Sequence, residues 1–319
     1  MNSNNYKIWT LTDGSQGMIS QVIGLAQEFG NEIVQIKTVL RFPWSFLQPG
    51  ILPTFKYIFK NEIPKLDKQN IVISCGRKSV YLSTYLKKKY SNIINIHIQN
   101  PKTSFHKFNF IVAPNHDNIQ GKNVVHSAGA LHKFSPEIIS RIKNTYGISA
   151  DNLVTCIIGG ESQHYYFNEK EAVDICSKIK ALKSNNPEIY ILILTSRRTR
   201  SAIKKIIKQK LSSIATLWLG EGDNPYAFAL KSSSKFIVTS DSTSMISESA
   251  ISGKPIYIYQ LPFKRASKRF EKFHNEFKQL NITRDFKDNT ILSNWSYTPL
   301  YESKRIAGII KQRIIQDQK

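Results

Sequence analysis

The sequence predicts an α/β protein built from two doubly wound, Rossmann-like domains. Short apolar runs typical of buried strands alternate with helical segments along most of the 319 residues. This alternation pauses near residue 150 and then restarts with the same order of elements. We therefore predict one domain over residues 1–150 and a second over residues 151–319. In such folds the ligand is expected in a cleft between the two domains, at the carboxyl ends of the strands.

The first domain opens with an apolar strand that runs into a polar loop. The loop contains Asp13 and Gly14 and precedes a helix with apolar residues on one face. A later strand ends at a turn that carries Arg77 and Lys78, which makes this turn a candidate anion site. A helix is expected over residues 134–147. The predicted strands of this domain are residues 6–11, 32–39, 70–74, 93–98 and 110–113.

Two stretches each allow two interpretations. Residues 40–59 are rich in aromatic residues and proline, which suits either an irregular cover packed on the domain or an acceptor-binding or membrane-facing excursion. Residues 264–278 are basic and carry Phe270, Phe273 and Phe277 at helical spacing. These phenylalanines suit a helix packed on the core, which we favour, or a helix lying at a membrane interface.

Composition limits the class of protein. The 45 Lys and Arg against 23 Asp and Glu give a formal net charge of +22. A bias toward Lys, Asn and Ile explains this best, an anionic membrane surface comes next, and nucleic acid last because no recognition module is visible. No apolar run reaches the roughly 20 residues of a membrane span, and the first residues do not resemble a signal peptide. The three cysteines show no metal-binding spacing, so we expect no metal site and a cytoplasmic protein. Peripheral contact with the inner face of the membrane stays open.

The second domain repeats strand, loop and helix. Strands over residues 153–158 and 189–194 run into Gly159-Gly160 and into Ser196-Arg197-Arg198. A third unit, residues 235–259, reads as strand, turn, helix and strand. Because the carboxyl ends of parallel strands share one edge of a sheet, the three loops should converge.

The turn of the third unit is the most informative stretch of the chain. It contains Asp241, Ser242, Thr243 and Ser244, and Glu248 follows about one turn into the helix. Such a turn either only caps the helix or also offers N–H and hydroxyl donors to a phosphate or a sugar. Glycines admit a ligand close to the backbone, arginines bind phosphate oxygens, and a carboxylate accepts hydrogen bonds from a ribose. The set suits a nucleoside diphosphate, whereas the fingerprints of P-loop and dinucleotide-binding proteins are missing.

Several motifs together resemble one family. They are SRRT at residues 196–199, NPY at 224–226, DSTSM at 241–245, ESAISGKP at 248–255, IQNP at 98–101, and PNHD and GALHKF between residues 114 and 134. The combination resembles the elongated-mitochondria, or mitochondrial fission protein, family, whose bacterial members have an expected glycosyltransferase-B-like (GT-B) fold. The second half is also similar to the N-acetylglucosaminyltransferase of peptidoglycan synthesis, in which a Ser/Gly-rich turn and a helical glutamate hold the nucleotide.

The resemblance implies a metal-independent glycosyltransferase that uses a nucleotide sugar as substrate and no cofactor. It places Ser242, Thr243 and Ser244 at the diphosphate and Glu248 at the ribose. The convergence of the loops adds Gly159, Gly160, Ser196, Arg197, Arg198 and Asp241 to the expected donor site. A base from the first domain, Asp13 or else Asp117, would deprotonate the acceptor, for which a lipid-linked or envelope glycan is expected. Two alternatives stay open: a non-hydrolysing sugar-nucleotide epimerase, and a non-catalytic adaptor like that implied by the plant relatives.

Overall fold

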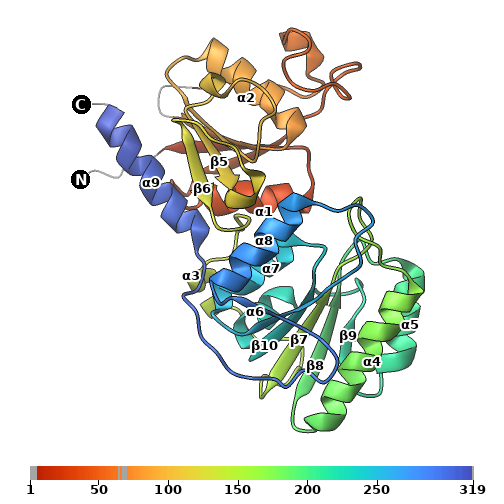
Figure 1. Ribbon diagram of the computed structural model, residues 1–319. Helices are drawn as coiled ribbons and strands as arrows, with labels where there is room; N and C mark the ends of the chain where they lie inside the picture. Colours follow the sequence, from red (N-terminus) through yellow and green to blue (C-terminus); the bar gives the residue numbers. More distant parts are fainter. Residues whose placement is uncertain (1–5, 64, 67–69, 318–319) are drawn as a thin grey trace. The chain divides into compact units, whose positions relative to one another are not determined.

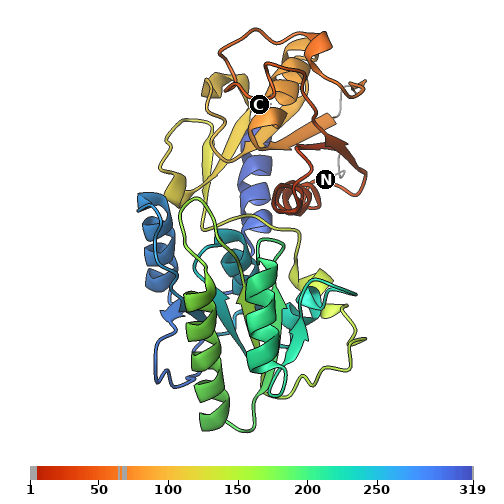
Figure 2. The ribbon, with the colours of Figure 1, turned by 90° about the vertical axis from the view of Figure 1, so that its right-hand side faces the viewer.

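A computed structural model describes residues 6–63, 65–66 and 70–317, and the chain divides into two compact units. Unit 1 contains the chain up to Lys133 together with the segment from Tyr301 onward, and unit 2 contains Phe134–Leu300. Each unit is built on one parallel six-stranded sheet with helices on its faces (Figures 1 and 2). The predicted α/β class with two doubly wound sheets is confirmed.

The sheet of unit 1 has the order β2-β1-β3-β4-β5-β6. Its central strands are buried on both faces, as their uninterrupted apolar runs require. One face is covered by helices α1 and α9, and the other by α2 and by residues 40–60 (Figure 1). The strands are β1 (Lys7–Thr12), β2 (Ile33–Lys37), β3 (Asn70–Cys75), β4 (Ile94–Ile98), β5 (Phe110–Pro114) and β6 (Val124–Ser127), and the helices are α1 (Gln16–Ala26), α2 (Arg77–Lys89), α9 (Glu302–Asp317) and the short 3-10 helices η1 (Lys56–Ile58), η2 (Phe105–Lys107) and η3 (Asn115–Asp117).

The sheet of unit 2 has the order β12-β11-β10-β7-β8-β9. Apolar residues of α4 and α5 pack on one face of it, and α6 and α7 lie on the opposite side (Figure 1). The strands are β7 (Leu153–Ile158), β8 (Tyr190–Thr195), β9 (Thr216–Trp218), β10 (Lys235–Thr239), β11 (Ile256–Tyr259) and β12 (Thr283–Asp285), and the helices are α3 (Pro136–Ser140), α4 (Glu169–Asn185), α5 (Ser201–Leu211), α6 (Tyr226–Ser232), α7 (Thr243–Ser249), the 3-10 helix η4 (Ala250–Ser252) and α8 (Lys268–Gln279).

The boundary predicted at residue 150 is displaced in the structure. The segment that follows Lys133 packs in unit 2, where the rings of Phe134 and Tyr226 lie 5.8 Å apart. The C-terminal helix α9 returns to unit 1, against the prediction that the second domain runs to residue 319. Its apolar residues Ile306 and Ile310 join the core that α1 forms with the sheet of unit 1.

The helix predicted over residues 134–147 is largely absent. Only α3 forms, and the chain beyond it is irregular up to β7. The side-chain amide of Asn144 donates to the carbonyl of Ile148 at 2.7 Å, and its oxygen accepts from the N–H of Tyr146. Such local side-chain hydrogen bonds compete with the helical ones, which explains why the helix stops.

Residues 40–60, which we call the aromatic excursion, connect β2 towards β3 without regular strands. Trp44, Ile58 and Phe59 are buried against the sheet, so the predicted packed cover is confirmed for these residues. Other aromatic residues of the same stretch are exposed and are considered below. The predicted anion site at the start of α2 is occupied by protein, because the Arg77 guanidinium donates to the carbonyls of Ser45 and Leu47 and so ties the excursion to α2.

Helix α8 contains the basic stretch with regularly spaced phenylalanines. Phe273 and Phe277 are fully buried, and Phe270 packs edge-on against Tyr165 at 5.1 Å. The core-packing interpretation of this stretch is therefore confirmed, and the membrane-facing one is wrong. Among the described residues, no helix is both long and apolar enough to cross a membrane.

Candidate functional site

The three loops predicted to converge in unit 2 do so at the switch point of its sheet. From β7 the chain proceeds through β8 and β9 on one side, and β10, β11 and β12 lie on the other. A crevice at the carboxyl ends of the strands is expected where the order reverses, between β7 and β10. Arg198 from the loop after β8 and Gly160 from the loop after β7 both bind Asp241, which follows β10.

Asp241 holds this arrangement together. Its side chain is fully buried, and the carboxylate accepts from the Thr239 hydroxyl at 2.6 Å and from the Gly160 N–H at 3.1 Å. The Arg198 guanidinium lies 2.6 Å from the same carboxylate and is itself 41% exposed. Burial raises the pKa of Asp241, and the Arg198 charge and the hydrogen bonds oppose this rise. We predicted a ligand contact for Asp241, but its carboxylate is engaged by protein donors.

The two glycines are required by this packing. A Cβ on Gly159 would lie 2.2 Å from both carboxylate oxygens of Asp241, and a Cβ on Gly160 would lie 2.2 Å from the Arg198 carbonyl oxygen. The Gly159 N–H donates to the Thr239 hydroxyl at 2.8 Å. Glycine was expected here to admit a ligand, whereas in the structure it admits a protein carboxylate and a neighbouring loop.

The Thr199 hydroxyl connects the loop after β8 to β7 by hydrogen bonding. The Thr199 hydroxyl lies 3.1 Å from the Ile158 carbonyl oxygen and also accepts from the N–H of Ser196. The Ser196 hydroxyl in turn accepts from the N–H of Arg198 at 3.1 Å. Arg197 is exposed and, within the residues that the structure covers, its guanidinium has no protein partner. Of the two predicted arginines, Arg197 is thus the one that an anionic ligand could bind without breaking an ion pair.

The predicted residues of the turn before α7 differ in what they bind. Ser242 is the N-cap, and its hydroxyl accepts from the Met245 N–H at 3.4 Å, so the capping interpretation is confirmed for this residue. Thr243 and Ser244 form the first turn and are half-buried. Their hydroxyls make no hydrogen bond to any other described residue, which leaves them available as donors and acceptors.

Glu248 is oriented by a residue that the sequence analysis did not select. The Tyr226 hydroxyl donates to the Glu248 carboxylate at 2.6 Å, from the first position of α6. Burial raises the pKa of Tyr226 well above its usual value, and the Glu248 charge and hydrogen bond act in the same direction. The NPY motif was the available signal, since the Asn224 side chain accepts from the N–H of Tyr226, the first residue of α6.

The two candidate bases of unit 1 are far apart. Asp13 follows β1, and Asp117 lies in η3 after β5, three strand positions away in the sheet, which is about 14 Å at ordinary strand spacing. Asp13 lies at the switch point of this sheet, between β1 and β3, where one of its carboxylate oxygens accepts from the Ser15 N–H at 2.9 Å. Asp117 lies beside the buried His116, with 3.9 Å between the Asp117 oxygen and Nε2. Of the two, only Asp13 lies at the switch point of this sheet.

Comparison with known sequences decides the family. A sequence model of the family described as "Mitochondrial fission ELM1" matches residues 16–314, which is nearly the whole chain. The chain belongs to this family. "Uncharacterized protein RP120" of Rickettsia prowazekii (strain Madrid E) is 30% identical over 348 aligned residues, covering 95% of this chain and 97% of that protein. "Mitochondrial fission protein ELM1" of Arabidopsis thaliana is 22% identical over 275 residues, covering 76% of this chain and 64% of the plant protein.

Solved structures similar to this ELM1-family chain have the GT-B fold. UDP-GlcNAc 2-epimerase from Methanocaldococcus jannaschii matches with a TM-score of 0.55 and 14% identity, over 96% of this chain and 99% of that one. The same enzyme in complex with UDP-GlcNAc and UDP matches with a TM-score of 0.52. The glycotransferase of kitacinnamycin matches with a TM-score of 0.50 and 11% identity, over 97% and 93% of the two chains. At these identities the likeness establishes the fold alone.

The turn that carries Asp241 is in contact with the side chain of His274 from α8. The imidazole Nε2 lies 3.0 Å from the Ser240 carbonyl oxygen, and burial lowers the pKa of His274 to about 4 from its usual 6.5. Between these values the unfolded chain binds a proton that the folded chain does not. The free energy of unfolding should therefore fall as the pH drops from 6.5 towards 4, by on the order of 3 kcal/mol.

Urea unfolding at the two ends of this pH window measures the effect. His97 of unit 1 is also buried, with its pKa lowered to about 3, so the wild-type slope contains both histidines. The informative quantity is the difference between wild type and His274→Gln, which should lose part of the slope. His106→Gln, at an exposed histidine, should keep the wild-type slope. An unchanged slope in His274→Gln would contradict the assignment.

Proposed function

We propose that this ELM1-family protein is a GT-B glycosyltransferase that transfers a sugar from a nucleotide-sugar donor without a bound metal ion. One observation carries the proposal: at the switch point of unit 2, Asp241 binds donors from the converging loops, beside groups that have no partner among the described residues. These groups are the Arg197 guanidinium and the hydroxyls of Thr243 and Ser244. The names of the similar structures, UDP-GlcNAc 2-epimerase and a glycotransferase, support a nucleotide sugar as the ligand.

Each group has a role that its chemistry suits. Arg197, with the exposed side of Arg198, binds the diphosphate, and Thr243 and Ser244 donate to its oxygens. Glu248 accepts hydrogen bonds from the ribose hydroxyls, and Tyr226 keeps its carboxylate in place as a positioning residue. Fixed cations stabilise the departing diphosphate and so take the role that a metal ion has in other transferases.

The reaction forms one bond and breaks one. The acceptor hydroxyl oxygen attacks the anomeric carbon, the bond from that carbon to the phosphate oxygen breaks, and the nucleoside diphosphate leaves with the electron pair. The acceptor proton passes to a carboxylate, for which we propose Asp13, with Asp117 as the alternative. Asp13 has one carboxylate oxygen on the Ser15 N–H, which fixes its orientation. The proposed acceptor is a lipid-linked or cell-envelope glycan.

A thermal-shift panel of nucleoside diphosphates and nucleotide sugars, run with and without EDTA, tests the donor site. A ligand at a hundred times its dissociation constant should stabilise the protein by roughly 2.7 kcal/mol. Arg197→Ala should lose this stabilisation while keeping the melting temperature of the free protein. Glu248→Ala should lose it as well, from a lower melting temperature of the free protein, because the Tyr226 hydroxyl loses its acceptor. Tyr226→Phe should weaken binding by up to about tenfold, since it removes one hydrogen bond to the Glu248 carboxylate.

The controls are exposed charges of the same unit. Lys180→Ala and Glu188→Ala remove an exposed cation from α4 and an exposed anion that precedes the amino end of β8, and both should bind like wild type. Arg198→Ala is a poor test because it also unpairs the buried Asp241. If no nucleotide shifts the melting curve of the wild type, the proposed nucleotide-sugar donor is wrong. If EDTA abolishes the shift, the proposed metal independence is wrong.

Two other functions use the same fold. The epimerase structures support an epimerase as the second candidate, and it is recognised by a change in the sugar while the nucleotide stays attached. A transferase instead releases the nucleoside diphosphate. The name of the plant relative supports a non-catalytic adaptor. In that case Glu248→Ala should leave partner binding and phenotype intact.

A further inference from the structure

The exposed apolar residues of the protein gather on the aromatic excursion of unit 1. Among the described residues, twelve large apolar side chains are exposed, and five of them come from this one segment. Phe42 and Phe46 are the most exposed aromatic residues, at 79% and 78%. The five are Phe42, Phe46, Ile51, Phe55 and Tyr57. Scattered exposure needs no explanation, whereas such a concentration marks a surface for interaction.

The excursion presents these residues from an ordered frame. Trp44 is buried, its indole N–H donates to the Pro53 carbonyl at 2.9 Å, and its ring meets Tyr57 edge-on at 5.7 Å. Phe55 stacks on the same tyrosine at 5.9 Å. The Tyr81 hydroxyl of α2 donates to the Gln48 carbonyl at 2.9 Å. The apolar side chains are therefore held outwards by a folded segment and are not the result of a loose loop.

The charge around these side chains has one sign. No Asp or Glu occurs between Glu32 and Glu62, and the excursion carries Arg41, Lys56 and Lys60, all exposed. Aromatic side chains interleaved with cations are typical of proteins that bind the surface of an anionic bilayer. A second copy of this chain is a poor occupant, because each copy carries a formal net charge of +22.

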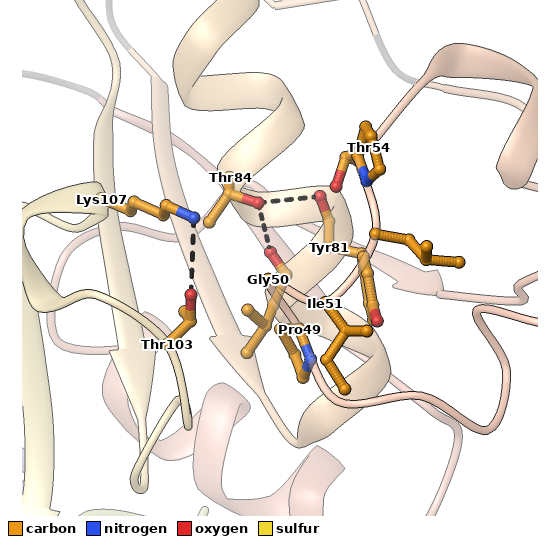
Figure 3. Close-up of a pocket in the computed structure, with 11 residues that line it drawn as sticks. Pro49, Gly50, Ile51, Thr54, Tyr81, Thr84, Thr103 and Lys107 are labelled. Atoms are coloured by element: carbon orange, nitrogen blue, oxygen red, sulfur yellow. Dashed lines mark hydrogen bonds between the residues drawn. The ribbon is translucent and has the colours of Figure 1, made fainter.

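A pocket adjoins the same segment. It has a volume of about 400 Å³ and lies between residues 49–54 of the excursion, the helix α2 and Lys107 (Figure 3). Figure 3 shows Ile51 and Pro49 on one side and Lys107 with Thr103 on the other. The Lys107 ammonium lies 3.4 Å from the Thr103 hydroxyl. An apolar wall facing an ammonium group suits the phosphate headgroup of a lipid.

We propose that the aromatic excursion is a docking surface for an anionic lipid bilayer, with Lys107 contacting a lipid phosphate in the adjoining pocket. The exposed phenylalanines enter the headgroup region, and the cations bind the anionic lipids. The surface belongs wholly to unit 1, so this proposal does not depend on the nucleotide site of unit 2.

Sedimentation with vesicles tests it directly. The full chain should bind vesicles of phosphatidylcholine mixed with phosphatidylglycerol more tightly than vesicles of phosphatidylcholine alone, and salt should weaken the binding. Phe42→Ser with Phe46→Ser should lower the partition coefficient by about tenfold or more. Lys56→Gln with Lys60→Gln, and Lys107→Gln alone, should lower it by about fivefold for each charge removed.

Matched variants in unit 2 distinguish binding by this surface from non-specific binding of the protein to vesicles. Ile291→Ser removes a more exposed apolar side chain, and Lys205→Gln with Lys208→Gln removes two exposed cations. The apolar control should bind vesicles like wild type, and the lysine control should differ from it far less than Lys56→Gln with Lys60→Gln. All excursion variants should keep the nucleotide-induced thermal shift, whatever that shift is in the wild type.

Insertion has a spectroscopic readout that folding defects do not imitate. Relative to wild type, which already contains four tryptophans, Phe46→Trp should gain fluorescence that shifts to shorter wavelength on anionic vesicles and is quenched by brominated lipids. The fluorescence that Tyr190→Trp adds in unit 2 should show neither change. Equal vesicle binding by wild type and Phe42→Ser/Phe46→Ser, or no binding by wild type, overturns the proposal. A dimer in lipid-free solution that the double variant dissociates also overturns it, in favour of a second copy.

Discussion

Gly159→Ala is expected to destabilise unit 2 by about 3 kcal/mol. The new methyl group would lie 2.2 Å from both carboxylate oxygens of Asp241. That carboxylate has little freedom to move, because Thr239, Gly160 and Arg198 all bind it. The clash should therefore separate the loops at the switch point, and nucleotide affinity should fall together with the urea midpoint.

A double-mutant cycle isolates the cause. Asp241→Ala alone should cost about 2 to 3 kcal/mol, since buried donors lose their acceptor. In that background Gly159→Ala should cost less than about 1 kcal/mol, because the atoms it meets are gone. Gly308→Ala in α9, where a Cβ meets nothing within 4 Å, should add independently to Asp241→Ala. Additivity of Gly159→Ala with Asp241→Ala would contradict the packing described here.

Gly24→Ala in α1 is expected to have an effect as large, in unit 1. Its Cβ would lie 2.0 Å from the carbonyl oxygen of His132 and 2.4 Å from the carbonyl carbon. This neighbour is backbone, which has no alternative rotamer, so the helix or the segment before residue 134 must shift. We expect a loss of about 3 kcal/mol or more, even though alanine is the better helix former by about 1 kcal/mol.

Gly17→Ala on the same helix is the matched control. A Cβ there meets nothing within 4 Å, and the residue is exposed. This variant should be as stable as wild type or slightly more so, as measured by urea unfolding at neutral pH. If Gly24→Ala behaved like Gly17→Ala, the close approach of α1 to His132 would not exist in solution.

Much of the fold follows from local patterns. Buried parallel strands appear as continuous apolar runs, so most strands of both sheets lie within a residue or two of their predicted positions. Helix α4 begins at a local signal, because Asn168 caps it in a capping box with Glu171. Helix 134–147 failed because the Asn144 side chain, and not the apolar spacing, determines the local hydrogen bonding.

Elements with weak or ambiguous patterns needed the tertiary structure. No element was predicted after residue 278, although β12 and α9 form there. Helix α9 belongs to unit 1 because Ile306 and Ile310 complete a core whose members outside α9 lie about 175 or more positions earlier in the chain. The phenylalanines of α8 have a spacing that suits a membrane interface as well as a core, and only their burial decides.

The site divides in the same way. The sequence by itself determined the family, the order of the strands along the chain, and which loops follow the strands of the second sheet, because these depend on neighbours along the chain. The tertiary structure decided which polar atoms remain available. Asp241 meets Gly160 from 81 positions away, and Glu248 meets Tyr226 across two elements. Such pairings depend on strand order and register, which bring distant residues together and leave Arg197, Thr243 and Ser244 without protein partners among the described residues.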